Sequence, residues 1–166
     1  MAGGRSEVEA SLLGLALGYA AAVDALDGAA FADLFTDDGE LWVPDLAAGG
    51  EPTIRRAGRE QLERIPSGLA RYRATHHAVR ASDYEVTGGT ATGEVTGVAH
   101  HLRVDVDGYD GGTDVIWYLR YVDDYVDTAG AWRIVRRVLH LQGIEERAVS
   151  RLGPERPSGG ERTLWS

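Results

Sequence analysis

The residues best suited to acid–base chemistry are two adjacent histidine pairs, His76-His77 and His100-His101, on either side of a Gly88-Gly89 turn. Both pairs fall in segments with the alternating pattern of β-strands, where neighbouring side chains point to opposite faces. If the two glycines form a two-residue hairpin loop, His76 faces His101 on one side of the sheet. His77 and His100 then share the other side. Because histidine titrates near neutral pH, a pair that faces a cavity is suited to proton transfer.

The apolar pattern favours His76 and His101 as the inner pair. Small apolar residues share their face of the hairpin, whereas acidic residues gather on the face of His77 and His100. Helices cover the apolar side of such a sheet. Arg80 does not fit the inner set, and a β-bulge would change part of this assignment. With such a bulge, His77 takes the place assigned to His76.

An aspartate lies where a helix should bury an apolar residue. A helix is predicted from Ser6, its N-cap, to about Leu26, and Asp24 continues its apolar stripe. A carboxylate at the helix C-terminus meets the negative end of the helix dipole, so a partner should compensate. Histidine is the simplest partner, because a carboxylate on one ring nitrogen makes the other a better base. The alternative is a helix that ends early and leaves Asp24 solvated in a turn.

Helical patterns come first along the chain and alternating patterns second, which predicts an α+β domain. The expected helices are 6–26, a short one through Phe35, and 58–69, with a strand at 40–43 and a loop from Pro44 to Pro52. The expected strands of the second half are 74–87, 90–106, 113–126 and 131–144. We expect a single domain over residues 6–149, a disordered N-terminus at 1–5 and a flexible tail at 150–166.

The last two strands carry the side chains of a possible pocket wall. With a four-residue loop at 127–130, one face of this hairpin carries mostly aromatic and aliphatic side chains with a few polar ones, and includes Trp117, Tyr121, Arg136 and His140. Such a lining suits an apolar or aromatic substrate that bears oxygen groups.

Composition excludes several classes of function. A net charge of −9 and a pI near 5.0, without a basic run, argue against nucleic acid or an anionic membrane as partner. We find no apolar run near 18 residues and expect a soluble, cytoplasmic protein. The chain has no Cys and no Lys, so thiolate nucleophiles, Schiff bases and covalently held pyridoxal phosphate are excluded.

From about Ser6 to Glu146 the chain resembles the SnoaL-like branch of the NTF2-like superfamily, which includes polyketide cyclases, scytalone dehydratase, lindane dehydrochlorinase and bile-acid dehydratase. The order and spacing of five segments carry the resemblance. They are Tyr19-x4-Asp24, Leu34–Trp42, Thr75-His76-His77, Thr90–Gly93 and Gly130–Ile134.

The resemblance implies a cone-shaped barrel, with three N-terminal helices packed on a curved, mainly antiparallel sheet, and a homo-oligomer such as a dimer or trimer. It also implies an Asp-His dyad that works without metal or organic cofactor. Asp24 matches the family's aspartate and Tyr19 the tyrosine of the dehydratases. His76 matches the base, or His77 if the hairpin is one residue shorter, and His101 matches a second histidine. The chain departs from the family at Tyr121, Arg136 and His140.

These observations predict a cofactor-independent lyase or isomerase-cyclase for a polyketide-like, aromatic or terpenoid compound of secondary metabolism or catabolism. His76, oriented by Asp24, would remove a proton, while Tyr19 and His101 bind the oxygen that leaves or gains charge. The main alternative is a non-catalytic small-molecule-binding or assembly module of the same fold. A third is a metal site made by His76, His101 and a carboxylate.

Overall fold

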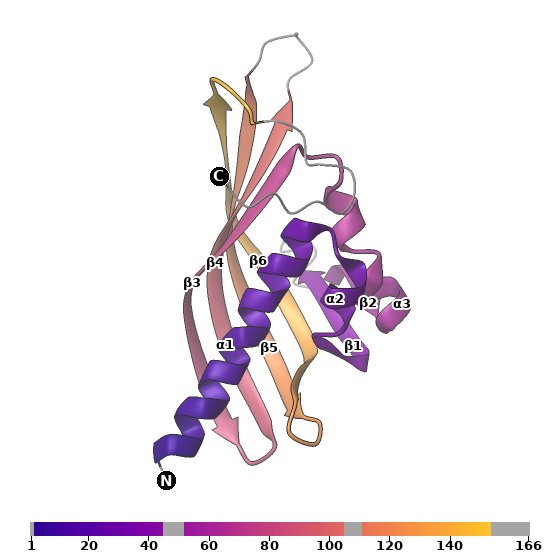
Figure 1. The fold of residues 1–166 in the computed structure, drawn as a ribbon, viewed down its shortest axis with the longest axis vertical. Coiled ribbons are helices and arrows are strands. Elements are labelled where there is room, and N and C mark those ends of the chain that lie inside the picture. Colours follow the sequence, from indigo (N-terminus) through magenta and orange to yellow (C-terminus); the bar gives the residue numbers. More distant parts are fainter. Residues whose placement is uncertain (1, 45–51, 105–110, 154–166) are drawn as a thin grey trace, which may run out of the picture.

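The computed structural model describes residues 2–44, 52–104 and 111–153 and consists of one curved sheet with helices on its concave side (Figure 1). The first half of the chain forms helices and a short hairpin, and the second half forms four long strands. The helices are α1 (Ala2–Ala25), α2 (Gly28–Ala32), α3 (Arg59–Glu63) and the 3-10 helix η1 (Pro66–Leu69). The strands are β1 (Phe35–Pro44), β2 (Pro52–Ala57), β3 (Ala74–Thr87), β4 (Thr90–Val104), β5 (Gly112–Asp127) and β6 (Trp132–Val149).

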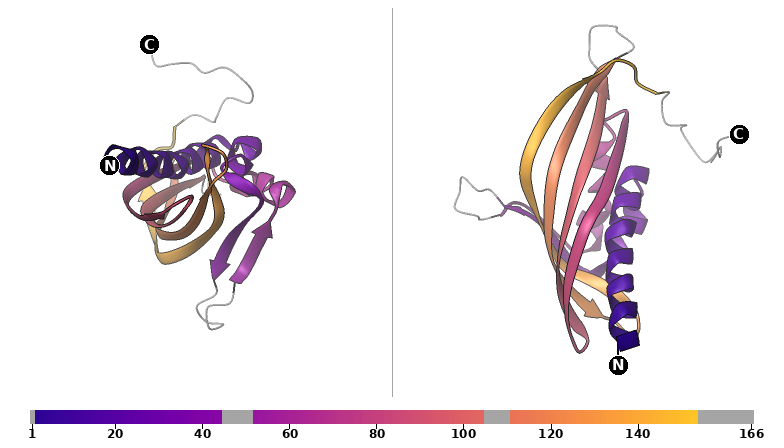
Figure 2. Two further views of the ribbon diagram at one scale, coloured as in Figure 1. Left: turned by 90° about the horizontal axis from the view of Figure 1, so that it is seen from below. Right: turned by 90° about the vertical axis from the view of Figure 1, so that its left-hand side faces the viewer.

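The six strands form a single sheet in the order β2-β1-β6-β5-β4-β3. Among these described strands, β1 and β6 pair in parallel, and the other neighbours are antiparallel. Strong curvature wraps the sheet around α1 and the short helices, as the end-on view shows (Figure 2). This arrangement confirms the predicted α+β cone with N-terminal helices on a mainly antiparallel sheet.

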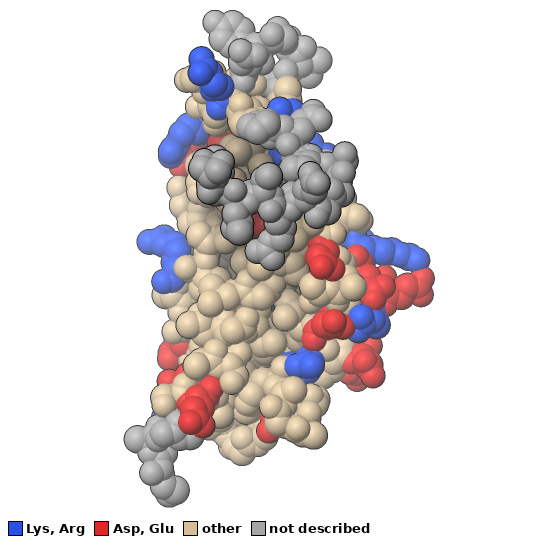
Figure 3. Space-filling view, viewed as in Figure 1, with Lys and Arg blue, Asp and Glu red and all other residues tan. Residues whose placement is uncertain are grey.

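Helix α1 lies along the concave side and supplies much of the core. Leu12, Ala16, Tyr19 and Val23 are buried against the sheet, while Leu17 on the opposite side is exposed. The segment Arg5–Ala25 is long and apolar enough, by length and composition, to be compared with a membrane span. That finding contrasts with the expectation from sequence that no such stretch exists. In the folded chain its apolar residues have a structural role, because one side of α1 packs on the sheet; few charged residues lie over this helix (Figure 3).

The first and third helices differ from their predicted bounds. Helix α1 begins at Ala2 rather than at Ser6, so residues 2–5 are helical instead of disordered, and an ion pair between Arg5 and Glu9 one turn later supports this first turn. The predicted helix 58–69 is divided into α3 and η1, because Pro66 has no backbone N–H to continue an α-helix.

The hairpin of β1 and β2 is larger than predicted. Strand β1 begins at Phe35, which was expected in a helix, and so starts five residues before the predicted strand at 40–43. Its pairing with β6 is irregular between Phe35 and Glu40. Strand β2 at the edge of the sheet was not predicted. Residues 45–51 of the expected loop and 154–166 of the expected tail lie outside the described residues. Strand β6 continues to Val149, five residues beyond the predicted end.

A β-bulge at Arg80 sets which histidine faces inward. Near the turn, β3 and β4 pair as expected, but Val79 pairs with Gly97 and Ala81 with Thr96, so Arg80 is an extra residue in β3. Gly97 suits this position, because a Cβ there would lie 2.8 Å from a backbone oxygen of β3. Beyond the bulge His76 pairs with His100 instead of His101. The expected inward direction of His76 is therefore wrong, and His77 points inward.

A second bulge, at Val135, changes the face of β6. Tyr125 pairs with Ile134 and Asp124 with Arg136, so Val135 is an extra residue in β6. Ile134 keeps its predicted inward direction, but beyond Val135 the alternation reverses. Arg137 is consequently buried, while Arg136 lies on the outer face.

Candidate active site

Asp24 and His77 form a close pair between the end of α1 and strand β3. The Asp24 carboxylate accepts hydrogen bonds from His77 Nδ1, from the His77 backbone N–H and from Thr75 Oγ1, each at 2.8 Å. The side chain of His77 is 11% exposed and that of Asp24 is 26% exposed. Asp24 therefore has the inward direction that its spacing predicted, with histidine as its partner.

The hydrogen bonds of this pair fix the state of the imidazole. Burial opposes the charged form of Asp24, but the bonds from His77 and Thr75 outweigh it and lower the pKa of Asp24 below its ordinary value. An ionised carboxylate only accepts hydrogen bonds, so Nδ1 of His77 carries the proton. In the neutral ring Nε2 then keeps a free lone pair, which is the form that a general base needs.

His101 lies beside His77 with its ring edge-on, at 5.6 Å between ring centroids. It is 1% exposed and its Nδ1 donates to the backbone oxygen of Val115 at 3.0 Å. The rings of Tyr72 and Trp117 also contact it, at 4.9 and 4.6 Å. Burial lowers the pKa of His101, so the ring stays neutral and presents Nε2 as an acceptor.

Tyr19 of α1 and Tyr121 of β5 place two phenols at the same site. Their rings meet edge-on at 5.5 Å and their hydroxyls are hydrogen-bonded. Burial raises the pKa of both hydroxyls, which therefore remain protonated donors at neutral pH. Both residues line the cavity described below.

A buried ion pair that the sequence did not reveal supports these tyrosines. Arg137 is 1% exposed and donates two hydrogen bonds to Asp123, at 2.9 and 2.7 Å. Its guanidinium lies over the rings of Tyr19 and Tyr121, at 4.3 and 4.5 Å from their centroids. Removing one partner of such a pair leaves a buried charge uncompensated, which costs roughly 3–5 kcal/mol.

The side chains of His77, His101 and the two tyrosines open onto a cavity of about 840 Å³ between the sheet, α1 and the short helices. The wall is mainly apolar, with a few polar groups directed into it, which is typical of a small-molecule site. Among the lining residues are Tyr19, His77, His101, Trp117 and Tyr121.

Three predicted site residues lie on the outer face instead. His76 is exposed on the side of β3 away from the cavity because of the bulge at Arg80. The bulge at Val135 has the same effect on Arg136, which pairs with Asp124 and stacks on Trp42. His140 pairs with Arg120 across the outer side of β5 and β6. The reversed alternation of β6 thus moves Arg136 and His140 out of the predicted wall and brings Arg137 and Leu139 inward.

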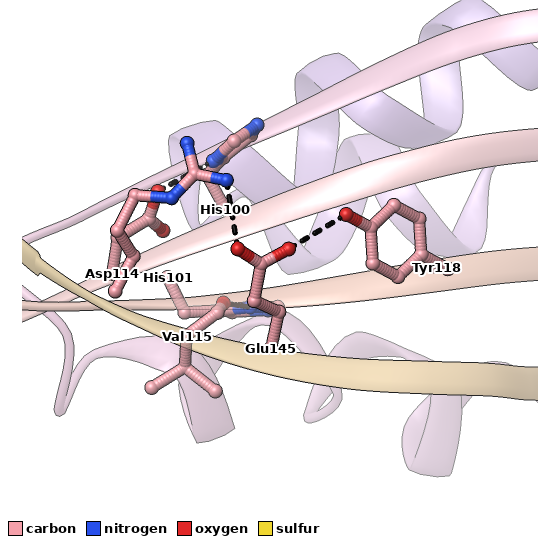
Figure 4. Close-up of polar contacts among 7 residues, drawn as sticks. His100, His101, Asp114, Val115, Tyr118 and Glu145 are labelled. Atoms are coloured by element: carbon pink, nitrogen blue, oxygen red, sulfur yellow. Dashed lines mark hydrogen bonds and ion pairs between the residues drawn. The ribbon is translucent and has the colours of Figure 1, made fainter.

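A second Asp-His pair occupies the outer face of β4 and β5 (Figure 4). His100 Nδ1 lies 2.7 Å from Asp114 Oδ2, and the His100 side chain is 38% exposed. Figure 4 shows the adjacent contact of Tyr118 with Glu145, at 2.9 Å. This pair faces away from the cavity, so it provides a natural internal control for the inner pair.

The predicted metal alternative does not fit this geometry. His76 and His101 point to opposite faces of the sheet and cannot bind one ion. Within residues 2–44, 52–104 and 111–153, no group of three His, Asp or Glu side chains is arranged to hold a metal.

Comparison with known proteins identifies a domain family. Residues 5–138 match the family model of a SnoaL-like domain. No curated protein sequence matches the chain.

Several solved structures share the fold at low sequence identity. A candidate scytalone dehydratase of Novosphingobium aromaticivorans has a TM-score of 0.74 at 20% identity, covering 94% of this chain and 100% of its own. The hexachlorocyclohexane dehydrochlorinase LinA-type3 of Novosphingobium barchaimii has a TM-score of 0.71 at 17% identity, covering 90% and 97%. Rv3472 of Mycobacterium tuberculosis, of unknown function, has a TM-score of 0.70 at 23% identity, covering 85% and 75%.

Proposed function

Because the chain belongs to the SnoaL-like family, we propose that it is a cofactor-independent lyase or isomerase of the dehydratase or cyclase type. Its substrate is a polyketide-like, aromatic or terpenoid small molecule. The observation that carries the proposal is the 2.8 Å contact of Asp24 with His77 at the wall of a mainly apolar cavity. Two proteins of the same fold have names that refer to elimination reactions, a dehydratase and a dehydrochlorinase.

In the proposed reaction, Nε2 of His77 removes a proton from an acidic carbon or hydroxyl of the substrate. Asp24 orients the ring and stabilises the imidazolium that forms. In a dehydration, the C–H electron pair becomes the new double bond, and the imidazolium returns its proton to the departing hydroxyl. In an isomerisation, the same proton returns to a different carbon.

The oxygen that gains charge during this step requires hydrogen-bond donors. Tyr19 and Tyr121 are protonated and line the cavity. Because one phenol donates its proton to the other, the second O–H is left to donate to a carbonyl or enolate oxygen. Neutral His101 acts on the substrate as an acceptor, for example of a hydroxyl proton. This division replaces the earlier expectation that Tyr19 and His101 both bind the same oxygen.

Two observations support an enzyme over the binding-module alternative. A binder needs no carboxylate behind its histidine, whereas Asp24 accepts three hydrogen bonds that fix the tautomer of His77. The cavity is also large enough to admit a bicyclic compound, rather than being filled by side chains. A cytoplasmic location, a small-molecule partner and a homo-oligomer, without nucleic acid or membrane, remain predictions.

The test uses 2-tetralone, a bicyclic ketone with acidic protons next to its carbonyl, as a probe of proton abstraction. Incorporation of deuterium from heavy water is followed by NMR. We expect the protein to accelerate this exchange over buffer, and His77→Gln to lose at least about 10²-fold of the acceleration, as is usual for removal of a general base.

His76→Gln is the matched control, because it removes the neighbouring histidine from the outer face. It should keep the exchange rate within about twofold. Circular dichroism verifies that both variants are folded. Equal rates for His77→Gln and the unmodified protein, or no acceleration by either, would contradict the proposal.

A further inference from the structure

We propose that the substrate of the cavity carries an oxyanion group, a carboxylate or a phosphate, which Arg56 and Arg71 bind at the cavity rim. This inference extends the proposed function, since it concerns the same cavity. It rests on the distribution of charge around the wall rather than on the Asp24–His77 pair.

The cavity wall differs in charge from the rest of the chain. The protein has 26 acidic and 17 basic residues, and a net charge of −9. None of the described residues that line the cavity is acidic, whereas three are arginines, Arg56, Arg64 and Arg71. A cation-lined opening on an acidic protein selects anionic ligands, because the surrounding surface repels them and the site attracts them.

Two of these arginines have no carboxylate partner among the described residues. Arg64 pairs with Glu60 at 2.5 Å. Arg56 bonds only a neighbouring backbone oxygen, and Arg71 bonds only the Tyr72 hydroxyl and stacks on that ring. A guanidinium has five N–H donors in a planar fork that matches a carboxylate or phosphate. Arg56 and Arg71 therefore keep most of their donors available to a ligand.

In the described hairpin of β1 and β2, the arginine without a carboxylate partner is the one on the cavity side. Arg55 and Arg56 are adjacent in β2 and point to opposite faces. Arg55 pairs with Glu40 at 2.5 Å and stacks on Trp42, away from the cavity. Arg56 lines the cavity together with Ile54, on the same side of the strand. The arginine on the side away from the cavity, Arg55, is therefore neutralised by a carboxylate, whereas Arg56 on the cavity side has no such partner in the described part of the chain.

Arg71 connects the rim to the polar groups inside. Its guanidinium lies 4.9 Å from the Tyr72 ring, which in turn contacts His101. Its charge also contributes, after burial, to the low pKa of His101. Arg71, Tyr72 and His101 thus contact one another in a row, with Arg71 at the outer end. An anion bound to Arg71 would lie at this outer end, and the apolar part of the substrate would point toward His77.

The experiment measures binding without turnover, by isothermal titration with three naphthalenes of similar size. 1-Naphthamide is neutral, 1-naphthoate carries a carboxylate and 1-naphthyl phosphate carries a phosphate. We expect at least one anion to bind about tenfold more tightly than the amide. The anion with the larger gain identifies the group that the site prefers.

Substitutions of single arginines show which residues cause the tighter binding of the anions. Arg56→Gln and Arg71→Gln should each weaken anion binding about fivefold and leave 1-naphthamide unchanged, which also shows that the cavity is intact. Arg55→Gln, the matched control in the same strand, should change neither affinity. High salt should weaken only the anions.

The proposal is overturned if neither anion binds more tightly than the amide, or if Arg55→Gln weakens binding as much as Arg56→Gln. Titrations with His77→Gln separate this result from the proposed function. That variant should bind the anion normally while losing proton exchange. If the anion preference fails, the proposed role of His77 is unaffected. If His77→Gln keeps full proton exchange, the anion preference is unaffected.

Discussion

The two oxygens of Asp24 have different partners, and this difference determines the chemistry of His77. One oxygen accepts from the His77 backbone N–H, which can only donate. The other accepts from His77 Nδ1 and from the hydroxyl of Thr75, both of which can exchange donor and acceptor roles. An amide at this position would therefore keep its oxygen on the backbone N–H and turn its NH2 group toward the ring.

Asp24→Asn is predicted to inactivate the protein by changing the tautomer of His77. The amide NH2 donates to Nδ1, the ring proton moves to Nε2, and the base toward the cavity is lost. We expect the rate of 2-tetralone exchange to fall by about 10²-fold, close to the loss in His77→Gln. Nitrogen NMR shifts of the His77 ring should show the proton on Nε2.

The outer pair supplies the control for this substitution. Asp114→Asn makes the same change beside His100, on the opposite side of the sheet. It should leave the exchange rate within about twofold. A full rate in Asp24→Asn, or an equal loss in both variants, would show that the carboxylate does not act through the tautomer of His77.

At the scale of elements, the sequence predicts the long strands of the second half, and two β-bulges account for the side chains whose direction it predicts wrongly. Hydrophobic period and turn residues located the four long strands of the second half, and the apolar stripe of α1 placed Asp24 inward. Each bulge adds one residue and so reverses the faces of the side chains that follow it, in β6 as far as a further register shift at Gln142. That reversal exchanged His76 for His77 and Arg136 for Arg137.

The two bulges left signals of unequal strength in the sequence. Arg80 interrupts the apolar face of β3, and this misfit is the reason that the sequence leaves a bulge open as an alternative. Gly97 lies opposite the irregular pairing. Val135 is apolar and fits either face, so period alone does not reveal it. The buried pair of Asp123 and Arg137 depends on this second bulge, and charged residues are seldom fully buried unless paired. The long-range contact, rather than local propensity, keeps Arg137 inside.

Deletion of Arg80 tests the first bulge. Without its extra residue, β3 can pair regularly with β4 while His77 keeps its inward direction, because Val79 still faces Gly97 and Ala81 still faces Thr96. We expect the shortened protein to fold, to lose no more than about 1 kcal/mol of stability and to keep most of its exchange activity.

A regular β3 in the native protein predicts a different outcome. His76 would then face the cavity, and removal of one residue would turn His76 outward and bring His77 into its place. In that case His76→Gln would abolish exchange in the native protein but not in the deletion variant, whereas with the bulge His77 is the essential histidine in both. Urea unfolding of the deletion variant shows whether lost activity reflects lost folding.

At the scale of the whole molecule, an acidic protein encloses a neutral histidine near an arginine, and this arrangement makes its stability depend on pH. The folded pKa of His101 lies below the ordinary value of 6.5, first because of burial and also because of the charges of His77 and Arg71. The backbone of Val115 and the charge of Asp114 act in the opposite direction. In the unfolded chain the imidazole is solvated and binds a proton more readily.

The sign of the effect follows from this difference. Between the folded pKa and 6.5 the unfolded state holds more protons, so the free energy of unfolding decreases as the pH falls through this window. One such group contributes at most about 1.4 kcal/mol per pH unit. Asp24 acts in a separate, more acidic window, because its stabilising contribution is present above its ordinary pKa of 3.8 and is lost only as the pH falls through its lower folded pKa.

His101→Gln should therefore flatten the dependence of stability on pH just below neutrality, because glutamine does not titrate and its amide can still donate to Val115. Urea unfolding at a series of pH values from 7.5 down to about 5 measures the slope. His76→Gln controls for the loss of an exposed histidine and should leave the slope unchanged. Equal slopes for His101→Gln and the unmodified protein would mean that His101 accepts a proton in the folded cavity as easily as in water, and the site would then hold an imidazolium ready to donate rather than a neutral acceptor.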